Sequence, residues 1–131
     1  MKRRIFLAMA MAALLGAGCA TDSAVRNARG TGLKRTYRQP IDRVHAALVV
    51  VAARRKLEVI EEDRAQGVMI LREDGSLSGD RIGVFLTANN ERSTTVEVVT
   101  RAGFSGIPVA DWAGRLQGDL EQELTPRRPV Q

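Results

Sequence analysis

Cys19 is the only cysteine in the chain, and it directly follows the small residues Gly16, Ala17 and Gly18. Signal peptidases cleave segments of small residues, and a cysteine just after such a segment supplies a thiol that lipid can alkylate. Because the chain has no second cysteine, neither a disulfide nor a cysteine-based metal site is expected. The sequence therefore predicts that this thiol is a site of lipid attachment.

A basic and then apolar leader precedes this cysteine. Lys2, Arg3 and Arg4 are followed by the uncharged segment 5–18. The length of this segment lies within the ~7–15 residues of a secretory apolar region and falls short of the ~20 residues that span a bilayer. We therefore expect residues 1–18 to be a cleaved signal peptide.

The residues around the cleavage site, Leu15-Gly16-Ala17-Gly18-Cys19, resemble a bacterial lipobox. The usual motif has Leu three residues before the cysteine, whereas Gly16 occupies that position here, so the match is to a looser form. The resemblance implies cleavage before Cys19, a thioether-linked diacylglycerol on its sulfur and an acyl chain such as palmitate on its new amine. Two or more chains hold a protein stably on a membrane, whereas one chain gives only marginal binding.

The residue after the cysteine bears on location. Ala20 stands where a retention signal would have Asp, which in lipoproteins of this kind resembles the pattern for sorting to the outer membrane, facing the periplasm. Two alternatives remain open for the leader. One is an ordinary signal peptide that leaves Cys19 as a free thiol, and the other is an apolar helix that is retained as an anchor.

The segment that follows, residues 20–32, is polar, rich in small side chains and without periodicity. Residues 19–32 are therefore predicted to be the lipidated cysteine and a flexible tether, which as a coil would reach about 20 Å. The tether and the start of the domain are basic. The simpler interpretation is a solvated surface, and the alternative is attraction to anionic lipid headgroups. The basic residues are Arg26, Arg29, Lys34, Arg35, Arg38 and Arg43.

The charge of the whole chain overstates the charge of the mature protein. The formal net charge is +5, but three basic residues belong to the leader, which leaves 17 basic against 15 acidic residues. The chain also has only one Trp, one Tyr and three Phe, and no basic stripe with aromatic residues between the charges. Nucleic-acid binding is therefore not expected.

The first helix is predicted from Pro40, which suits a helix start because no N–H is needed there. Val49 and Val50 lie off its apolar stripe, and a run of valines is unfavourable in a helix. Either another element or a partner covers these two valines, or the helix prediction is wrong at this point. The stripe recurs at three- and four-residue steps and consists of Ile41, Val44, Leu48, Val51 and Ala52.

Strands are predicted from alternation. Residues 81–87 and 94–101 alternate apolar and polar side chains, whereas residues 67–72 are mostly apolar, as in a strand buried on both faces. Val99 is an exception, because it is apolar on an otherwise polar face. The five predicted strands are 33–39, 57–62, 67–72, 81–87 and 94–101.

The second predicted helix covers residues 108–124 and carries an apolar stripe that includes Trp112 and Leu120. The order strand, helix, four strands, helix predicts an α+β fold of two layers, in which two helices pack on a mostly antiparallel sheet. This single domain is expected over residues 33–125, and a flexible tail, residues 126–131, follows it.

Three segments of the domain carry a resemblance to a known group: Tyr37-x-x-Pro40 before a helix, residues 57–69 (LEVIEEDRAQGVM) and the strand Thr95-Val-Glu-Val98. Together with the lipobox, they resemble small uncharacterised bacterial lipoproteins of the outer membrane. The domain of those proteins is similar to the helix-grip modules in lipoprotein subunits of the outer-membrane assembly machine. The resemblance implies a fold and no residue roles, because a fold does not determine a function.

The remaining polar residues give little support for catalysis. His45 is the only histidine, and the chain offers it no serine in an elbow motif and no paired metal ligand. On a strand, Glu61 and Glu62 point to opposite faces and cannot act as a carboxylate pair. The loop 74–80 lacks the ligand spacing of a calcium hand. We therefore expect no enzyme activity, no cofactor and no metal site.

The expected function is that of a lipid-anchored cell-envelope protein, a non-enzymatic binding or scaffold module at the periplasmic face of a membrane. Trp112 is either a core residue or, with Val49 and Val50, a contact for an envelope protein partner or a groove. The alternative is a small periplasmic carrier or sensor of an apolar ligand. Its pocket would be lined by Leu48, Val84, Leu116 and Leu120.

Overall fold

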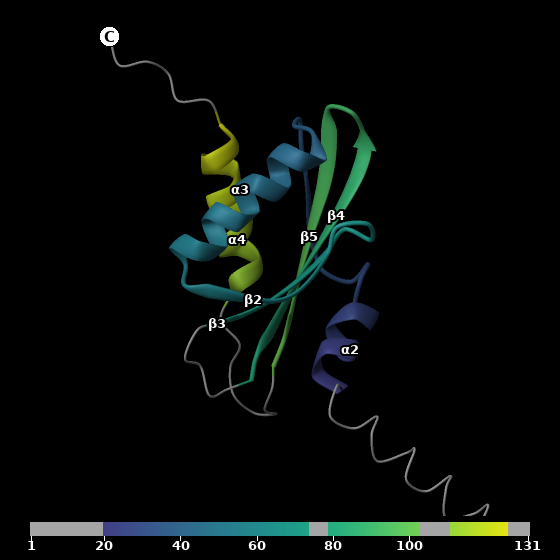
Figure 1. The fold of residues 1–131 in the computed structure, drawn as a ribbon, viewed down its shortest axis with the longest axis vertical. Helices are drawn as coiled ribbons and strands as arrows, with labels where there is room; N and C mark the ends of the chain where they lie inside the picture. Colours follow the sequence, from purple (N-terminus) through teal and green to yellow (C-terminus); the bar gives the residue numbers. More distant parts are fainter. Residues whose placement is uncertain (1–19, 74–78, 103–110, 126–131) are drawn as a thin grey trace, which may run out of the picture.

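The computed structural model describes residues 20–73, 79–102 and 111–125 (Figure 1). The predicted signal peptide, Cys19 and the predicted tail lie outside these residues. Eight elements follow one another in the described part. They are α2 (Ala20–Asn27), β1 (Leu33–Tyr37), α3 (Ile41–Arg54), β2 (Leu57–Asp63), β3 (Val68–Glu73), β4 (Arg81–Asn90), β5 (Ser93–Arg101) and α4 (Trp112–Leu124).

The five strands form one sheet in the order β1-β5-β4-β3-β2, and every neighbouring pair is antiparallel. The first strand therefore pairs with the last, Leu33 opposite Val98, and β1 and β2 form the two edges. The predicted α+β class with an antiparallel sheet is confirmed. The last two strands are longer than the predicted 81–87 and 94–101, because β4 continues to Asn90 and β5 begins at Ser93, which leaves a short turn between them.

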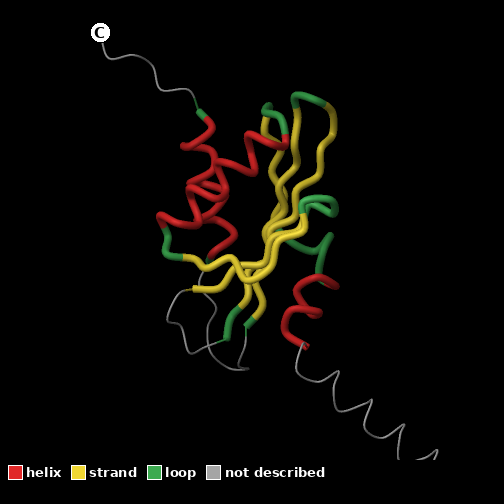
Figure 2. Tube along the Cα trace, viewed as in Figure 1, coloured by secondary structure: helices red, strands yellow, loops and turns green. Residues whose placement is uncertain are grey.

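Helices α3 and α4 lie together on one face of the sheet, here called the inner face (Figure 2). Their apolar stripes pack against alternate residues of the strands, such as Val84 and Val96. α3 stays helical through its valines, so the helix prediction is confirmed there. α4 begins at Trp112, after Asp111, whose side chain accepts the N–H of Gly114 at 3.0 Å. The predicted start at Pro108 lies outside the described residues.

Helix α2 covers the opposite, outer face, where the tether was predicted to be flexible, and that prediction is wrong for Ala20–Asn27. Val25 is fully buried among Ile70, Phe85 and Val99, and a second small core forms there. Val99 is apolar on this face because α2 covers it. The helix adds a third layer, and the folded unit extends N-terminally beyond the predicted start at residue 33.

Gly83 explains how α2 comes so close to the sheet. A Cβ atom at this position would lie 2.4 Å from Cγ1 of Val25, closer than side chains approach one another. A glycine in a strand often marks such a close approach of another element. The helix was not visible in the sequence because Val25 is the only large apolar side chain among its eight residues, which gives no clear apolar period.

Candidate functional site

The solvent-exposed face of α3 contains two valines that lie outside its buried apolar stripe. Val49 and Val50 are each 43% exposed, and Val59 on the neighbouring strand β2 is 39% exposed. Val59 lies opposite the buried Leu71, so it belongs to the inner face that α3 packs on. We call these three residues the valine surface.

Val49 and Val50 contribute little to the core of the described domain. A valine in a helix interior is less favourable than alanine by about 0.5 kcal/mol, because its χ1 freedom is lost. Val51 recovers this cost by burial, since it is fully buried, but its two neighbours remain half-exposed. The local sequence therefore departs from what folding alone favours, which is expected at sites under functional constraint.

Polar and charged residues lie beside the valine surface where α3 meets α4. Val50 lines a surface groove of about 200 Å³ with Arg43 and Glu123. Two ion pairs join the helices: Arg54 to Glu123 at 3.2 Å, and Arg55 to Asp119 with hydrogen bonds of 2.6 and 3.0 Å. The hydrogen bonds from the Arg55 guanidinium hold the pKa of Asp119 below its usual value. The two ion pairs thus link α3 and α4 on the exposed side of their packed apolar contact.

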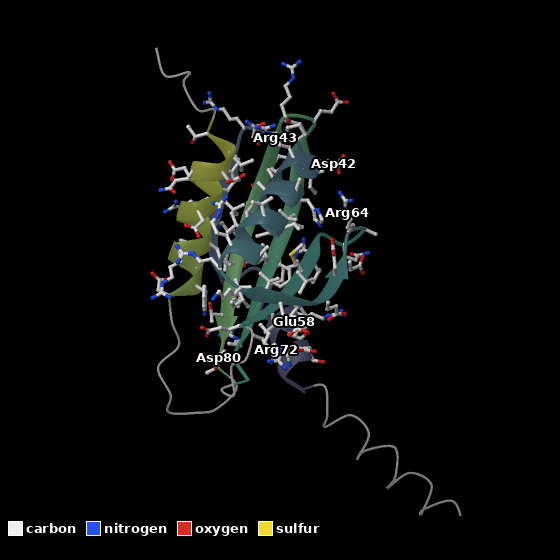
Figure 3. All side chains as sticks on the ribbon, turned by 60° about the vertical axis from the view of Figure 1, so that its left-hand side comes forward. Asp42, Arg43, Glu58, Arg64, Arg72 and Asp80 are labelled. Carbon is white, nitrogen blue, oxygen red and sulfur yellow. The ribbon has the colours of Figure 1, made fainter. Side chains whose placement is uncertain are left out.

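A second small pocket lies between the start of α3 and the β2–β3 turn. His45 Nε2 hydrogen-bonds the Glu62 carboxylate, and at the rim Arg64 bonds Asp42 at 3.1 Å. Figure 3 shows Asp42 and Arg64 near one another on the same side of the molecule. Glu61 instead pairs with Arg26 of α2, so the two glutamates do face opposite sides of the sheet.

This pocket contains a histidine–carboxylate pair, as some catalytic sites do, but its described residues include no hydroxyl or thiol nucleophile. Its volume of about 60 Å³ holds only a few water molecules. No serine, threonine, cysteine or tyrosine is among the described residues that line it, so His45 has a carboxylate partner and no hydroxyl or thiol to activate. Within the described ranges, no three His, Cys, Asp or Glu side chains are arranged to hold a metal ion.

Trp112 does not belong to the exposed surface. It is 6% exposed and packs in the inner core, with the Arg115 guanidinium 5.4 Å from its ring centre. From the sequence, Trp112 was either a core residue or a contact for a partner or groove, and the structure places it in the core. Of the three predicted contact residues, only Val49 and Val50 are available to a partner.

Two buried polar side chains of structural importance were not identified from sequence. Gln117 is fully buried in α4, where it accepts the Tyr37 hydroxyl at 2.6 Å and donates to the carbonyls of Val96 and Leu33. Glu97 lies on the outer face of β5, where the α2–β1 connection covers it and leaves it 5% exposed.

Comparison with known proteins adds no family to these observations. No protein-family model matches the chain, and no curated protein matches its sequence. Among the described helices, none has the length and apolar character needed to cross a membrane. The resemblance to envelope lipoproteins therefore remains a prediction based on the leader and the strand pattern.

Proposed function

We propose that the protein is a lipid-anchored component of the bacterial cell envelope that binds another envelope protein and catalyses no reaction. The leader and lipobox pattern support an anchor at Cys19, and Ala20 supports the periplasmic side of the outer membrane. A lipid anchor keeps a small domain at high effective concentration beside other proteins of the same membrane. A weak contact surface is then sufficient for association.

The observation that carries this proposal is the valine surface. It contains three of the four large apolar side chains that are exposed in the described residues. The helix that follows the anchor, α2, covers the outer face of the sheet, whereas α3 lies on the inner face. Anchoring through the N-terminus therefore leaves the valine surface open to a partner whose own apolar side chains would bury it.

The alternative functions have less support. The described residues that line the pocket beside His45 include no hydroxyl or thiol. The pocket therefore gives no support to hydrolysis by a nucleophile that His45 would activate. The four residues expected to line a ligand pocket are all fully buried and belong to one packed cluster with the α3 and α4 stripes. They are Leu48, Val84, Leu116 and Leu120.

The proposal is tested by photo-crosslinking in living cells. A photoreactive amino acid at Val49 or Val50 should crosslink to a specific envelope protein, whereas the same probe at Arg92, in the β4–β5 turn, should not. The captured protein is then purified and its binding measured. Binding should be lost with Val49→Asp and Val50→Asp combined and retained with Ala53→Asp, which alters another exposed position of α3.

Two results would overturn the proposal. Equal crosslinking from all three positions would mean that the valine surface is not a specific contact. For the anchor, mass spectrometry of the mature N-terminal peptide should find lipid on Cys19. An unmodified thiol, or a mature chain that begins elsewhere, would remove the lipid anchor from the account.

A further inference from the structure

We propose that α2 holds the domain in one orientation on the phospholipid surface, with the Arg81 end of the sheet toward the bilayer and the β4–β5 turn away from it. This inference rests on the proposed lipidation of Cys19. It replaces a flexible tether, which would let the domain tumble, with a helix that is fastened to the fold.

The position of Cys19 is limited by its distance along the chain from Asp22. Three residues span at most about 10 Å even when fully extended. Asp22 accepts a hydrogen bond of 3.1 Å from Nε of Arg81, the first residue of β4. Asp22 is therefore held at the end of the sheet where β4 begins and β5 ends, because Arg81 is paired with Arg101. We call this the anchor end, since a lipid attached three residues before Asp22 would be tied to it.

The opposite end of α2 lies farther along the same strand. Arg29, just after the helix, donates to the Gln66 carbonyl at 2.8 Å and contacts the Thr87 hydroxyl at 3.4 Å. Thr87 lies six positions after Arg81 along β4, which corresponds to about 20 Å. Helix α2 thus runs beside β4 from the anchor end toward the β4–β5 turn.

Several independent contacts fasten α2 to the outer face. Val25 and Ala28 are buried there, and Arg26 forms an ion pair with Glu61 of β2. Beyond the helix, the buried Glu97 carboxylate accepts the backbone N–H groups of Gly30 and Gly32. Apolar contacts, an ion pair and a buried carboxylate therefore hold both the helix and the turn that follows it.

This geometry also separates the basic residues of the N-terminal region. Arg38 directly follows Tyr37, which is paired with Thr94 near the β4–β5 turn. Figure 3 shows Arg43 at the opposite end of the molecule from Asp80. Arg38 therefore lies more than about 20 Å along the sheet from the anchor end, beyond the ~8 Å over which charges act at physiological ionic strength. Headgroup attraction is therefore expected for Arg101 and not for Arg38 or Arg43.

The experiment uses the lipidated full-length protein in vesicles of phosphatidylethanolamine and phosphatidylglycerol. Because Cys19 is the only native cysteine and its thiol carries the lipid, an introduced cysteine can be labelled alone. A fluorophore on Arg101→Cys should be strongly quenched by a quencher on the lipid headgroups. The same fluorophore on Arg92→Cys, in the β4–β5 turn, should be quenched little.

Two changes should abolish this difference. A glycine-serine insertion of about 12 residues between Cys19 and Ala20, ahead of α2, would give the domain a tether of about 20 Å and free rotation. Val25→Asp places a charge in the outer core and should release α2, whereas Ala24→Asp, at an exposed position of the same helix, should not. Circular dichroism shows whether each variant is folded, and the insertion variant leaves every described contact intact.

The outcomes separate this inference from the proposed function. Equal quenching of the two labels in the otherwise unchanged protein would overturn the fixed orientation, as would a difference that survives the insertion. Failure of the purified protein to float with the vesicles would instead show that the lipid anchor is absent, whatever α2 does.

Discussion

Both carboxylate oxygens of Glu97 accept the backbone N–H of Gly30, at 2.9 and 2.7 Å. One of these oxygens also accepts the N–H of Gly32 at 2.8 Å. The side chain is almost fully buried, and these backbone N–H groups satisfy its two oxygens. Gly32 has no room for a side chain, because a Cβ atom would lie 2.3 Å from the Val98 carbonyl oxygen. Glu97 thus fixes the connection between α2 and β1.

Glu97→Gln should loosen this connection. The amide keeps one acceptor oxygen but loses the charge, and its NH₂ group would face backbone N–H donors. Hydrogen bonds to charged groups contribute about 1.5–3 kcal/mol, so we expect the free energy of unfolding to fall by about 1–3 kcal/mol. Urea unfolding measures this change. Glu91→Gln, in the exposed β4–β5 turn, is the matched control and should stay within about 0.5 kcal/mol of the parent.

Gly83→Ala should displace α2, because the new methyl group would lie 2.4 Å from Val25 Cγ1. Forcing a methyl group into a packed core costs about 1–3 kcal/mol. Gly118→Ala is the control: its Cβ atom meets nothing within 4 Å, and alanine is favoured over glycine in a helix by about 1 kcal/mol. Thermal unfolding should therefore move in opposite directions for the two variants. A stabilised Gly83→Ala would contradict the close packing of α2 on the sheet.

The Tyr37 hydroxyl predicts a loss of stability at high pH. Burial is the main cause that raises the pKa of this group above its usual value of 10.0, and the hydroxyl donates to Gln117 Oε1 at 2.6 Å. Because the folded pKa is higher than the unfolded pKa, the contribution is fully present below about pH 10 and is lost as the pH rises through the folded pKa. Urea unfolding should show this decline in the parent and not in Tyr37→Phe.

The titration itself can be observed directly, because Tyr37 is the only tyrosine in the chain. Tyrosinate absorbance in the folded protein should rise at a higher pH than in the protein unfolded in urea. Coincident titration curves would mean that the Tyr37 hydroxyl is as solvated in the folded state as in the unfolded chain.

Most of the fold was predictable because apolar residues recur with a clear helical or strand period in its sequence. The stripe of α3 and the alternation of β4 each place buried side chains where the structure has them, such as Val44 and Val84. The strand order was not predictable, since pairing of β1 with β5 depends on contacts between residues far apart in the sequence. Nor was α2, whose stability comes from the sheet face it covers and not from its own short sequence.

The candidate site was predictable only because two valines of the predicted helix contribute neither to helix propensity nor to the apolar stripe. Val49 and Val50 were singled out because valines that lie off the apolar stripe neither favour a helix nor serve its core, and both are exposed. Glu97 gave no such signal, since a glutamate on the polar side of an alternating strand is ordinary. Its burial results from the turn after α2, so it could not be recognised before that helix was known.

The valine surface leads to the last prediction, which separates folding from binding. Val49→Ala and Val50→Ala together should leave the free energy of unfolding unchanged or raise it by up to about 1 kcal/mol, because alanine is the better helix former and little burial is lost. Val51→Ala is the matched control in the same run. It removes a fully buried side chain and should lower the free energy of unfolding by about 1–3 kcal/mol.

The same three variants should rank differently in partner binding. The double variant should weaken binding to the protein captured by crosslinking, because the apolar area that the partner covers is reduced. Val51→Ala should bind normally as long as it is folded, since its side chain faces the inner core. If the double variant were destabilised as much as Val51→Ala and bound its partner unchanged, these valines would serve the fold, and the contact surface would have to be sought elsewhere.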